Sequence, residues 1–329
     1  MNILVVGLGS MGKRRIRLIQ EMYPEYVIVG VDGREDRRNE AKKLFNIECV
    51  DSISGVDSKY NINAAFVCTS PLSHNVIIRE CLKNKWNVFT EINLVADGYE
   101  DNMKLAKENN CVLFLSSTFF YREEICYIRN RIDKGSKWNY IYHIGQYLPD
   151  WHPWENYKDF FVGDERTNGC REIMAIEMPW LTKTFGDIED VHVIADKMSN
   201  LKICYSDNYM IQLQHTNGNK GTLVVDVVSP VAVRKLDVYK ENEYFQWGGT
   251  PDSLYEYDKI NDQLKKVVLN EKEEHEKGYR TFIVENAYKN EIQEFFDVMN
   301  NDKEQVYGFE EDLKVLQIID QVEKKAWKN

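Results

Sequence analysis

Hydrophobic residues in the first 120 positions of the chain gather in short, wholly apolar runs. These runs predict β-strands over residues 3–6, 26–31, 65–68, 87–89 and 112–115. Amphipathic segments between them predict helices around Ile16, Ile19 and Met22 and over residues 34–45, 73–83 and 99–108. Short apolar strands that alternate with helices are typical of βαβ units around a buried parallel sheet.

The hydrophobic pattern changes after about residue 135. Longer strand-like runs follow, over residues 140–147, 191–197, 209–215, 222–228 and 236–240. Residues 211–214, Ile-Gln-Leu-Gln, alternate between apolar and polar, so one sheet face should be packed and the other wet or covered by a partner. Two helices with i, i+3, i+4, i+7 spacing close the chain, at 292–299 and 315–322. No flexible linker separates the two halves.

Composition narrows the class of protein. A chain of 329 residues exceeds the usual ~250–300 residues of one core, so two domains are expected. The net charge of −11 argues against nucleic acid and anionic membranes as partners. No apolar stretch reaches the ~18–20 residues of a membrane span, and the N-terminus lacks signal-peptide features. Seven cysteines without a C-x-x-C pair favour a reduced, cytoplasmic protein, and the histidine spacing predicts no metal site.

A glycine motif follows the first predicted strand and opens the first helix. It reads Gly7-Leu8-Gly9-Ser10-Met11-Gly12, and an acid, Asp32, ends the second predicted strand. In this context Gly7 permits a tight turn, Gly9 admits a pyrophosphate and Gly12 lets the helix approach the strand. The backbone N–H groups of Ser10 and Met11, at the start of this helix, would bind the phosphates. The alternative is a tight βα turn in another doubly wound protein.

Asp32 favours NAD as the cofactor, because an acid there accepts hydrogen bonds from the ribose and repels a 2′-phosphate. Arg34 leaves NADP as the alternative, since an arginine after this strand can bind a 2′-phosphate, although it can also be an ordinary surface residue. We therefore expect an α/β protein. A Rossmann dinucleotide-binding domain should span residues 1–120, and an α/β domain with a largely antiparallel, open-faced sheet should span residues 121–329.

Three further segments make the chain resemble the glucose–fructose oxidoreductase / inositol dehydrogenase (Gfo/Idh/MocA) family. They are Cys68–His74, similar to the family's T-x-P-x-x-x-H segment, Glu91-Ile92-Asn93, at its E-K-P motif, and Gly145–Trp151. The resemblance implies NAD(P)-dependent chemistry on sugars, cyclitols or nucleotide sugars, and homo-oligomers formed through the C-terminal sheet. Together with the fold it implies further cofactor contacts at Thr69, Ser70, Pro71, His74 and Glu91. For His74, a helix cap is the alternative.

The chain departs from the family at the proton-transfer residues. Ile92 stands where the family has the lysine that holds the reacting oxygen, and Asn93 replaces the proline. Counting back from Phe185-Gly186 places Ile173, Ile176 and Pro179 at the family's first acid, histidine and second acid. The chain is therefore expected to be a divergent member that uses another proton-transfer residue.

Two segments offer replacements. On the helix around residues 170–181, Glu177 is a candidate general base and Arg171 a candidate anion anchor, the alternative being a solvated helix face. In the segment 151–158, His152 is the second candidate acid/base, because the pKa of histidine lies near working pH. Trp151 and Trp154 could stack on a sugar, or the loop could be a packed lid.

Arg122 is a further candidate for substrate binding, because it follows the last Rossmann strand, near the expected ligand crevice. It could equally form an interdomain salt bridge. Three functions remain open: an NAD(P)-dependent oxidoreductase acting on a sugar or nucleotide sugar, a catalytically degenerate NAD-binding regulatory protein, and a lyase or epimerase that recycles bound NAD.

Overall fold

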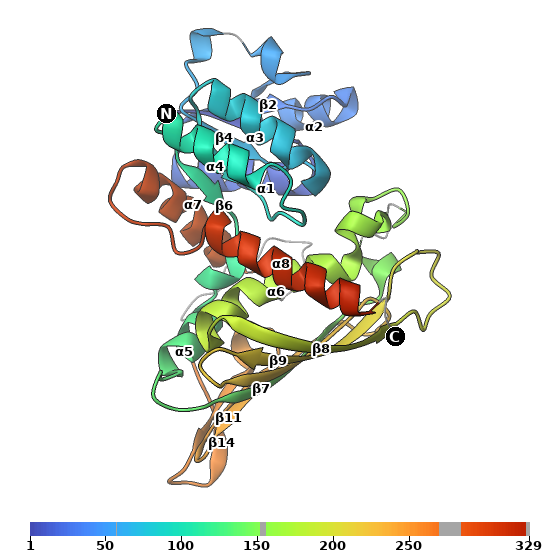
Figure 1. The fold of residues 1–329 in the computed structure, drawn as a ribbon. Coiled ribbons are helices and arrows are strands. Elements are labelled where there is room, and N and C mark those ends of the chain that lie inside the picture. Colours follow the sequence, from blue (N-terminus) through green and yellow to red (C-terminus); the bar gives the residue numbers. More distant parts are fainter. Residues whose placement is uncertain (57, 152–155, 270–283, 327–329) are drawn as a thin grey trace. The chain divides into compact units, whose positions relative to one another are not determined.

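The computed structural model describes residues 1–329 apart from 57, 152–155, 270–283 and 327–329 (Figure 1). The chain forms two compact units. The first comprises Met1–Ser117 with Tyr288–Leu313, and the second comprises Thr118–Ala287 with Lys314–Asn329. The expected boundary at residue 120 lies close to the first of these divisions. The expected assignment of all later residues to one domain differs, because residues 288–313 return to the first unit.

The first unit is built on a six-stranded sheet in which all described strands pair in parallel. The strand order is β3-β2-β1-β4-β5-β6. The strands are β1 (Asn2–Val6), β2 (Val27–Val31), β3 (Glu48–Val50), β4 (Ala64–Val67), β5 (Asn87–Thr90) and β6 (Leu113–Leu115). The connecting helices are α1 (Ser10–Met22), α2 (Glu35–Phe45), α3 (His74–Lys83) and α4 (Tyr99–Glu108). The order reverses between β1 and β4, which is where such sheets bind their ligands.

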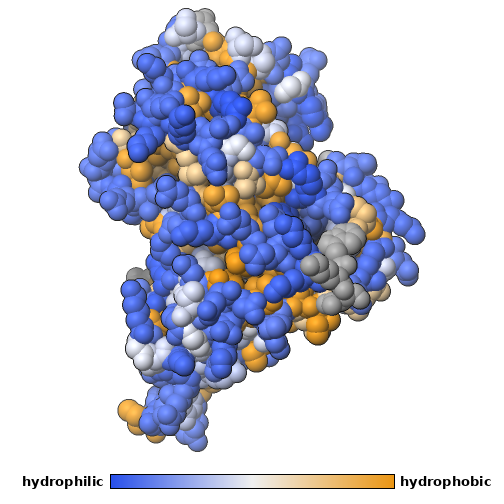
Figure 2. All heavy atoms as spheres, in the orientation of Figure 1, coloured by the Kyte–Doolittle hydropathy of each residue, from blue (hydrophilic) through white to orange (hydrophobic). Residues whose placement is uncertain are grey.

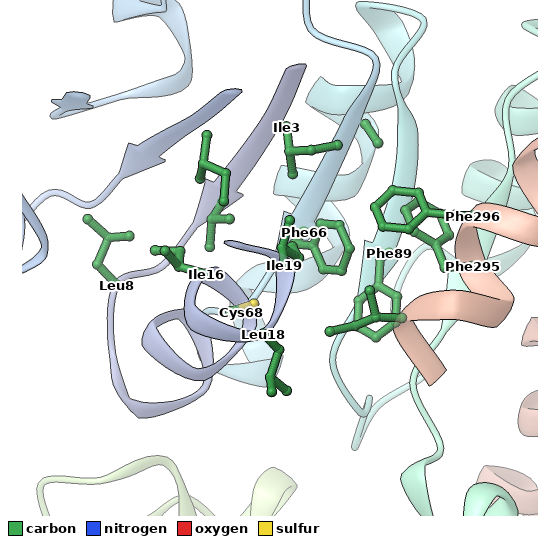
Figure 3. Close-up of a cluster of buried hydrophobic side chains, with 14 of the residues drawn as sticks. Ile3, Leu8, Ile16, Leu18, Ile19, Phe66, Cys68, Phe89, Phe295 and Phe296 are labelled. Atoms are coloured by element: carbon green, nitrogen blue, oxygen red, sulfur yellow. The ribbon is translucent and has the colours of Figure 1, made fainter. Parts of the chain in front are cut away.

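Aromatic and aliphatic side chains of alternate strand positions form the core on one face of this sheet. Figure 3 shows Phe66 and Phe89 from neighbouring strands beside Phe295 and Phe296. The latter belong to α7 (Glu285–Met299). The ring centroids of Phe66 and Phe295 lie 5.3 Å apart, at an interplanar angle of 85°. This packing explains why residues 288–313 belong to the first unit: the apolar stripe of α7 completes the Rossmann core.

The second unit contains an eight-stranded sheet in the order β14-β13-β12-β11-β7-β10-β9-β8. Its described pairs are antiparallel except β7 with β10. The strands are β7 (Asn139–Gly145), β8 (Ile188–Asp196), β9 (Asn208–His215), β10 (Lys220–Asp226), β11 (Val233–Lys240), β12 (Glu243–Trp247), β13 (Leu254–Asp258) and β14 (Gln263–Lys266). The helices are α5 (Glu123–Arg131), α6 (Gly169–Phe185) and the later part of α8 (Phe309–Ala326). The expected α/β class, with a parallel and a mostly antiparallel sheet, is confirmed.

One face of this second sheet packs against α6, and the other is open. On the open face, Ile141, Ile194 and Met210 are 47%, 73% and 56% exposed. Ile194 and Met210 pair directly between β8 and β9, so their side chains are neighbours. Figure 2 shows hydrophobic residues at the surface of the second unit among many hydrophilic ones.

Among the described residues, no helix has the length and apolar character needed to cross a membrane. Each of the seven cysteines carries a free thiol.

Candidate functional site

The loop between β1 and α1 requires glycine at two of its positions. Gly7 has φ +93°, and a Cβ there would lie 2.7 Å from the Cys68 carbonyl oxygen. A Cβ on Gly12 would lie 1.9 Å from the Gly7 carbonyl oxygen. These contacts let α1 begin directly against the strand, which aims its N-terminal N–H groups across the loop.

The space above Gly9 suits a pyrophosphate. A Cβ built on Gly9 would meet only the tip of Arg37, at 3.6 Å. Gly9 is also the N-cap of α1, and no side chain makes a cap hydrogen bond there. The N-terminal N–H groups at Ser10 and Met11 have the chemistry to bind the phosphates of a dinucleotide.

Asp32 lies just after β2, and its carboxylate organises the loop. Oδ2 accepts a hydrogen bond from the backbone N–H of Leu8 at 2.8 Å, and Oδ1 accepts one from the N–H of Arg34 at 2.9 Å. The Arg34 guanidinium pairs with Asp36 at 2.6 Å and thereby lowers the pKa of Asp36 to about 2. Arg37, which was not among the candidate site residues, has Nη1 3.7 Å from Asp32 Oδ2.

His74, at the start of α3, is 2% exposed. Its Nε2 lies 2.9 Å from the Thr69 carbonyl oxygen, and Nδ1 lies 2.6 Å from Asn93 Oδ1. Burial lowers the pKa of His74, which favours the neutral ring with a single N–H. Both partners are acceptors, so the neutral ring donates its one N–H either from Nε2 to the Thr69 carbonyl oxygen or from Nδ1 to Asn93 Oδ1. The ring thus joins the segment of Thr69, Ser70 and Pro71 to the turn after β5, and little of it is left for a cofactor.

Glu91, just after β5, is anchored within the first unit. Its carboxylate pairs with Arg15 of α1 at 2.6 Å, and Glu291 of α7 pairs with the same guanidinium at 2.7 Å. Although burial disfavours the charged form, attraction to Glu91 and Glu291 raises the pKa of Arg15. With Glu91 held by Arg15 and Asn93 by His74, the turn presents Ile92 from a fixed frame.

Glu177, the candidate base, is completely buried in the second unit. Oε2 accepts hydrogen bonds from Tyr142 Oη at 2.7 Å and Trp180 Nε1 at 2.8 Å, while Oε1 pairs with Arg234. Burial, followed by the negative charge of Glu177, raises the pKa of Tyr142 well above its usual range. The carboxylate is therefore already supplied with donors, an arrangement typical of a structural ion pair.

Arg171, the candidate anion anchor, is also engaged within its own unit. Its guanidinium pairs with Asp320 at 2.7 Å and with Glu323, both on α8. Arg122, the third charged candidate, is 5% exposed and pairs with Glu124 at 3.0 Å. These carboxylates compensate the positive charges that were expected to meet a substrate.

Glu172 is the acid on α6 that stands out in the structure. Its Oε2 is buried and has no hydrogen-bond partner among the described residues. Burial raises the pKa of Glu172 to about 8. A buried polar atom without a partner is rare in folded proteins and often marks a catalytic group.

The remaining candidates fall in the segment after β7. Trp151 Nε1 donates to the Gln146 carbonyl oxygen at 3.3 Å, which anchors the indole to its own loop. His152 and Trp154 lie outside the described residues. No group of three or more potential metal ligands occurs in the part of the chain that the structure describes.

Solved structures of similar fold cover almost the whole chain. Levoglucosan dehydrogenase in complex with NADH has a TM-score of 0.82 and 14% identity, over 100% of this chain and 97% of that one. The WlbA dehydrogenase from Bordetella pertussis, in complex with NADH and UDP-GlcNAcA, has a TM-score of 0.78 and 14% identity, over 99% and 96%. UDP-N-acetylglucosamine 3-dehydrogenase GnnA from Acidithiobacillus ferrooxidans has a TM-score of 0.76 and 13% identity, over 99% and 97%.

At such identities these structures show a shared fold, and no curated protein matches the sequence. A family model does match residues 1–117, and its description is an oxidoreductase family with an NAD-binding Rossmann fold. The matched segment contains the glycine loop and Asp32, whose geometry fits NAD. Residues 1–117 thus match the model of the Gfo/Idh/MocA oxidoreductase family, in agreement with the resemblance seen in the sequence.

Proposed function

We propose that the protein is an NAD-dependent oxidoreductase that acts on a CH–OH group of a sugar, cyclitol or nucleotide sugar. The observation that carries this proposal is the glycine loop, open above Gly9 and flanked by Asp32. The sugar dehydrogenases of similar fold, two of which have names or ligands that include a UDP-sugar, support the substrate class.

The expected roles follow from the chemistry of each group. NAD, when bound, accepts or supplies the hydride. Gly7, Gly9 and Gly12 let the backbone approach the pyrophosphate, and Asp32 accepts hydrogen bonds from the ribose. Arg37 lies beside Asp32, so the choice between NAD and NADP depends on this acid–arginine pair as much as on Arg34.

We assign proton transfer to Glu172 in preference to Glu177. During oxidation of the alcohol, the hydride leaves the carbon, the hydroxyl proton passes to the Glu172 carboxylate and the C=O bond forms. During reduction, protonated Glu172 returns that proton to the oxygen. With a pKa of about 8, Glu172 is mostly protonated at neutral pH, which favours reduction there and oxidation at alkaline pH. His152 stays a second candidate, outside the described residues.

The assembly is the other part of the proposal. The open sheet face around Ile141, Ile194 and Met210 would bury its apolar side chains against a second copy, giving a homo-oligomer. Free thiols on all cysteines are consistent with a cytoplasmic location.

Calorimetric titration of the full chain with NADH and NADPH tests the cofactor. We expect NADH to bind and NADPH to bind at least about tenfold more weakly, a difference of ~1.4 kcal/mol. Tighter binding of NADPH would contradict the preference, and failure of both to bind would end the proposal. The second candidate function, a regulatory protein that binds NAD without turnover, is supported by Ile92 in place of the lysine. NADH binding without turnover of any sugar would favour it.

A further inference from the structure

Arg234 lies at the centre of a side-chain cluster that the sequence does not reveal. It is the second residue of β11, and its Nη2 pairs with Glu177 while its Nε donates to Tyr142 Oη at 3.2 Å. Tyr142 in turn donates to Glu177 at 2.7 Å. The three groups form a closed ring of charge-assisted hydrogen bonds, which holds the guanidinium in one orientation.

Packing also fixes the Arg234 side chain, both at the face of the guanidinium and along its aliphatic part. The Arg234 guanidinium lies over the Phe119 ring, 4.7 Å from its centroid. Gly249 has φ +85°, and a Cβ there would lie 2.7 Å from Arg234 Cβ. The aliphatic part of Arg234 therefore fits only because residue 249 has no side chain. Neither Phe119 nor Gly249 adds a polar partner.

One nitrogen of the Arg234 guanidinium, Nη1, takes no part in these contacts. Nη1 makes no hydrogen bond among the described residues, and it is not one of the buried atoms that lack a partner. The side chain as a whole is 18% exposed. Solvent therefore reaches Nη1, whose two N–H groups point from a rigid frame toward accessible space.

The charge of the cluster indicates which ligand it suits. Although burial disfavours the charged form, Glu177 raises the pKa of Arg234, so the pair consists of a cation and an anion with no net charge. Such a pair attracts a phosphate or carboxylate weakly, whereas its fixed N–H groups remain good donors to a neutral oxygen. A sugar hydroxyl or carbonyl oxygen has the required chemistry.

We propose that Arg234 is a substrate-binding residue whose Nη1 donates hydrogen bonds to a neutral hydroxyl or carbonyl oxygen of the sugar. Glu177, with Tyr142, is the positioning residue that orients Arg234 and cancels its charge. This inference rests on the proposed function, because it assigns part of the substrate site of the same enzyme.

The test compares Arg234→Met, Arg234→Lys and Glu177→Gln with the wild type, using the sugar or UDP-sugar that the wild type turns over most rapidly. Arg131→Met is the matched control, since Arg131 forms an ion pair with Glu256 in the same unit. For Arg234→Met we expect KM to rise about tenfold or more, with NADH affinity unchanged. Arg234→Lys should recover part of this loss, which also guards against a mere folding defect.

Glu177→Gln provides a readout that a purely structural role would not move. It leaves the Arg234 charge uncompensated, so inorganic phosphate should become a competitive inhibitor of this variant and not of the wild type. Its pH–rate profile should keep the wild-type midpoint, because Glu177 does not transfer the proton.

Three results would overturn the inference. An unchanged KM in Arg234→Met, with normal turnover by the wild type, refutes substrate binding by Arg234 and leaves the proposed function intact. Competition by phosphate in the wild type refutes the neutral ligand. Absence of turnover in the wild type, with NADH still bound, removes the proposed function and this inference with it.

Discussion

Replacing Glu172 by glutamine removes an ionisable group and keeps the shape of the side chain. Burial raises the pKa of this carboxyl from 4.5 to about 8. The unfolded chain releases the proton near pH 4.5, whereas the folded chain keeps it up to about pH 8. Since the folded-state pKa is the higher one, the group's contribution to stability is fully present below about pH 4.5 and is lost as pH rises toward 8.

The magnitude follows from the size of the shift. One pKa unit corresponds to ~1.4 kcal/mol, so a shift from 4.5 to about 8 gives an upper limit of ~5 kcal/mol. Glu172 keeps partial exposure, and water screens part of this cost. We therefore expect Glu172→Gln to gain about 2 kcal/mol relative to the wild type between pH ~4.5 and pH ~8.

Urea unfolding at pH ~4.5 and pH ~8.5 measures this difference. Glu241→Gln, in the exposed turn between β11 and β12, is the control and should show no such gain. If the free energies of unfolding of Glu172→Gln and the wild type differ by the same amount at both pH values, Glu172 does not titrate abnormally. The assignment of proton transfer to it would then lose its basis.

Three further outcomes are expected. Phe295→Ala should lower the free energy of unfolding by about 3–5 kcal/mol, because its ring fills the core between α7 and the Rossmann sheet; a loss below ~1 kcal/mol by urea unfolding would contradict that packing. Asp32→Asn should weaken NADH binding and improve NADPH binding, since the charge that repels a 2′-phosphate is removed; calorimetry with both cofactors measures the change, and an unaltered ratio would refute the role of Asp32. Met210→Lys should lower the oligomeric state by placing a charge on the apolar open face; an unchanged mass in light scattering would show that this face is not the interface.

The first unit was largely predictable because its signals are local. The glycine motif, the strand that precedes it and Asp32 lie within one βαβ unit, and Gly7 and Gly12 take the close contacts that the motif requires. The place of α7 could not be predicted in the same way. Its apolar stripe indicates a buried face, but only the folded chain shows that Phe295 meets Phe66, which lies far away in the sequence.

The acids of α6 show why a candidate proton-transfer residue was harder to choose from the sequence. Glu172 and Glu177 both flank the same apolar face, so spacing treats them alike. Their environments differ because of donors from other strands: Tyr142 on β7 and Arg234 on β11 supply Glu177, whereas Oε2 of Glu172 receives none from the described residues. These hydrogen bonds come from residues far away in the sequence, so no local pattern encodes them.

Turnover of the full chain with NAD⁺ and a panel of sugars, cyclitols and UDP-sugars tests the central claim most directly. At alkaline pH we expect NADH absorbance to rise with at least one member of the panel. Glu172→Gln should lower that rate by roughly 10²–10⁴-fold while binding NADH normally. An unchanged rate in Glu172→Gln would contradict the proton-transfer assignment. No NADH with any member of the panel, from a chain that binds the cofactor, would contradict the enzyme itself.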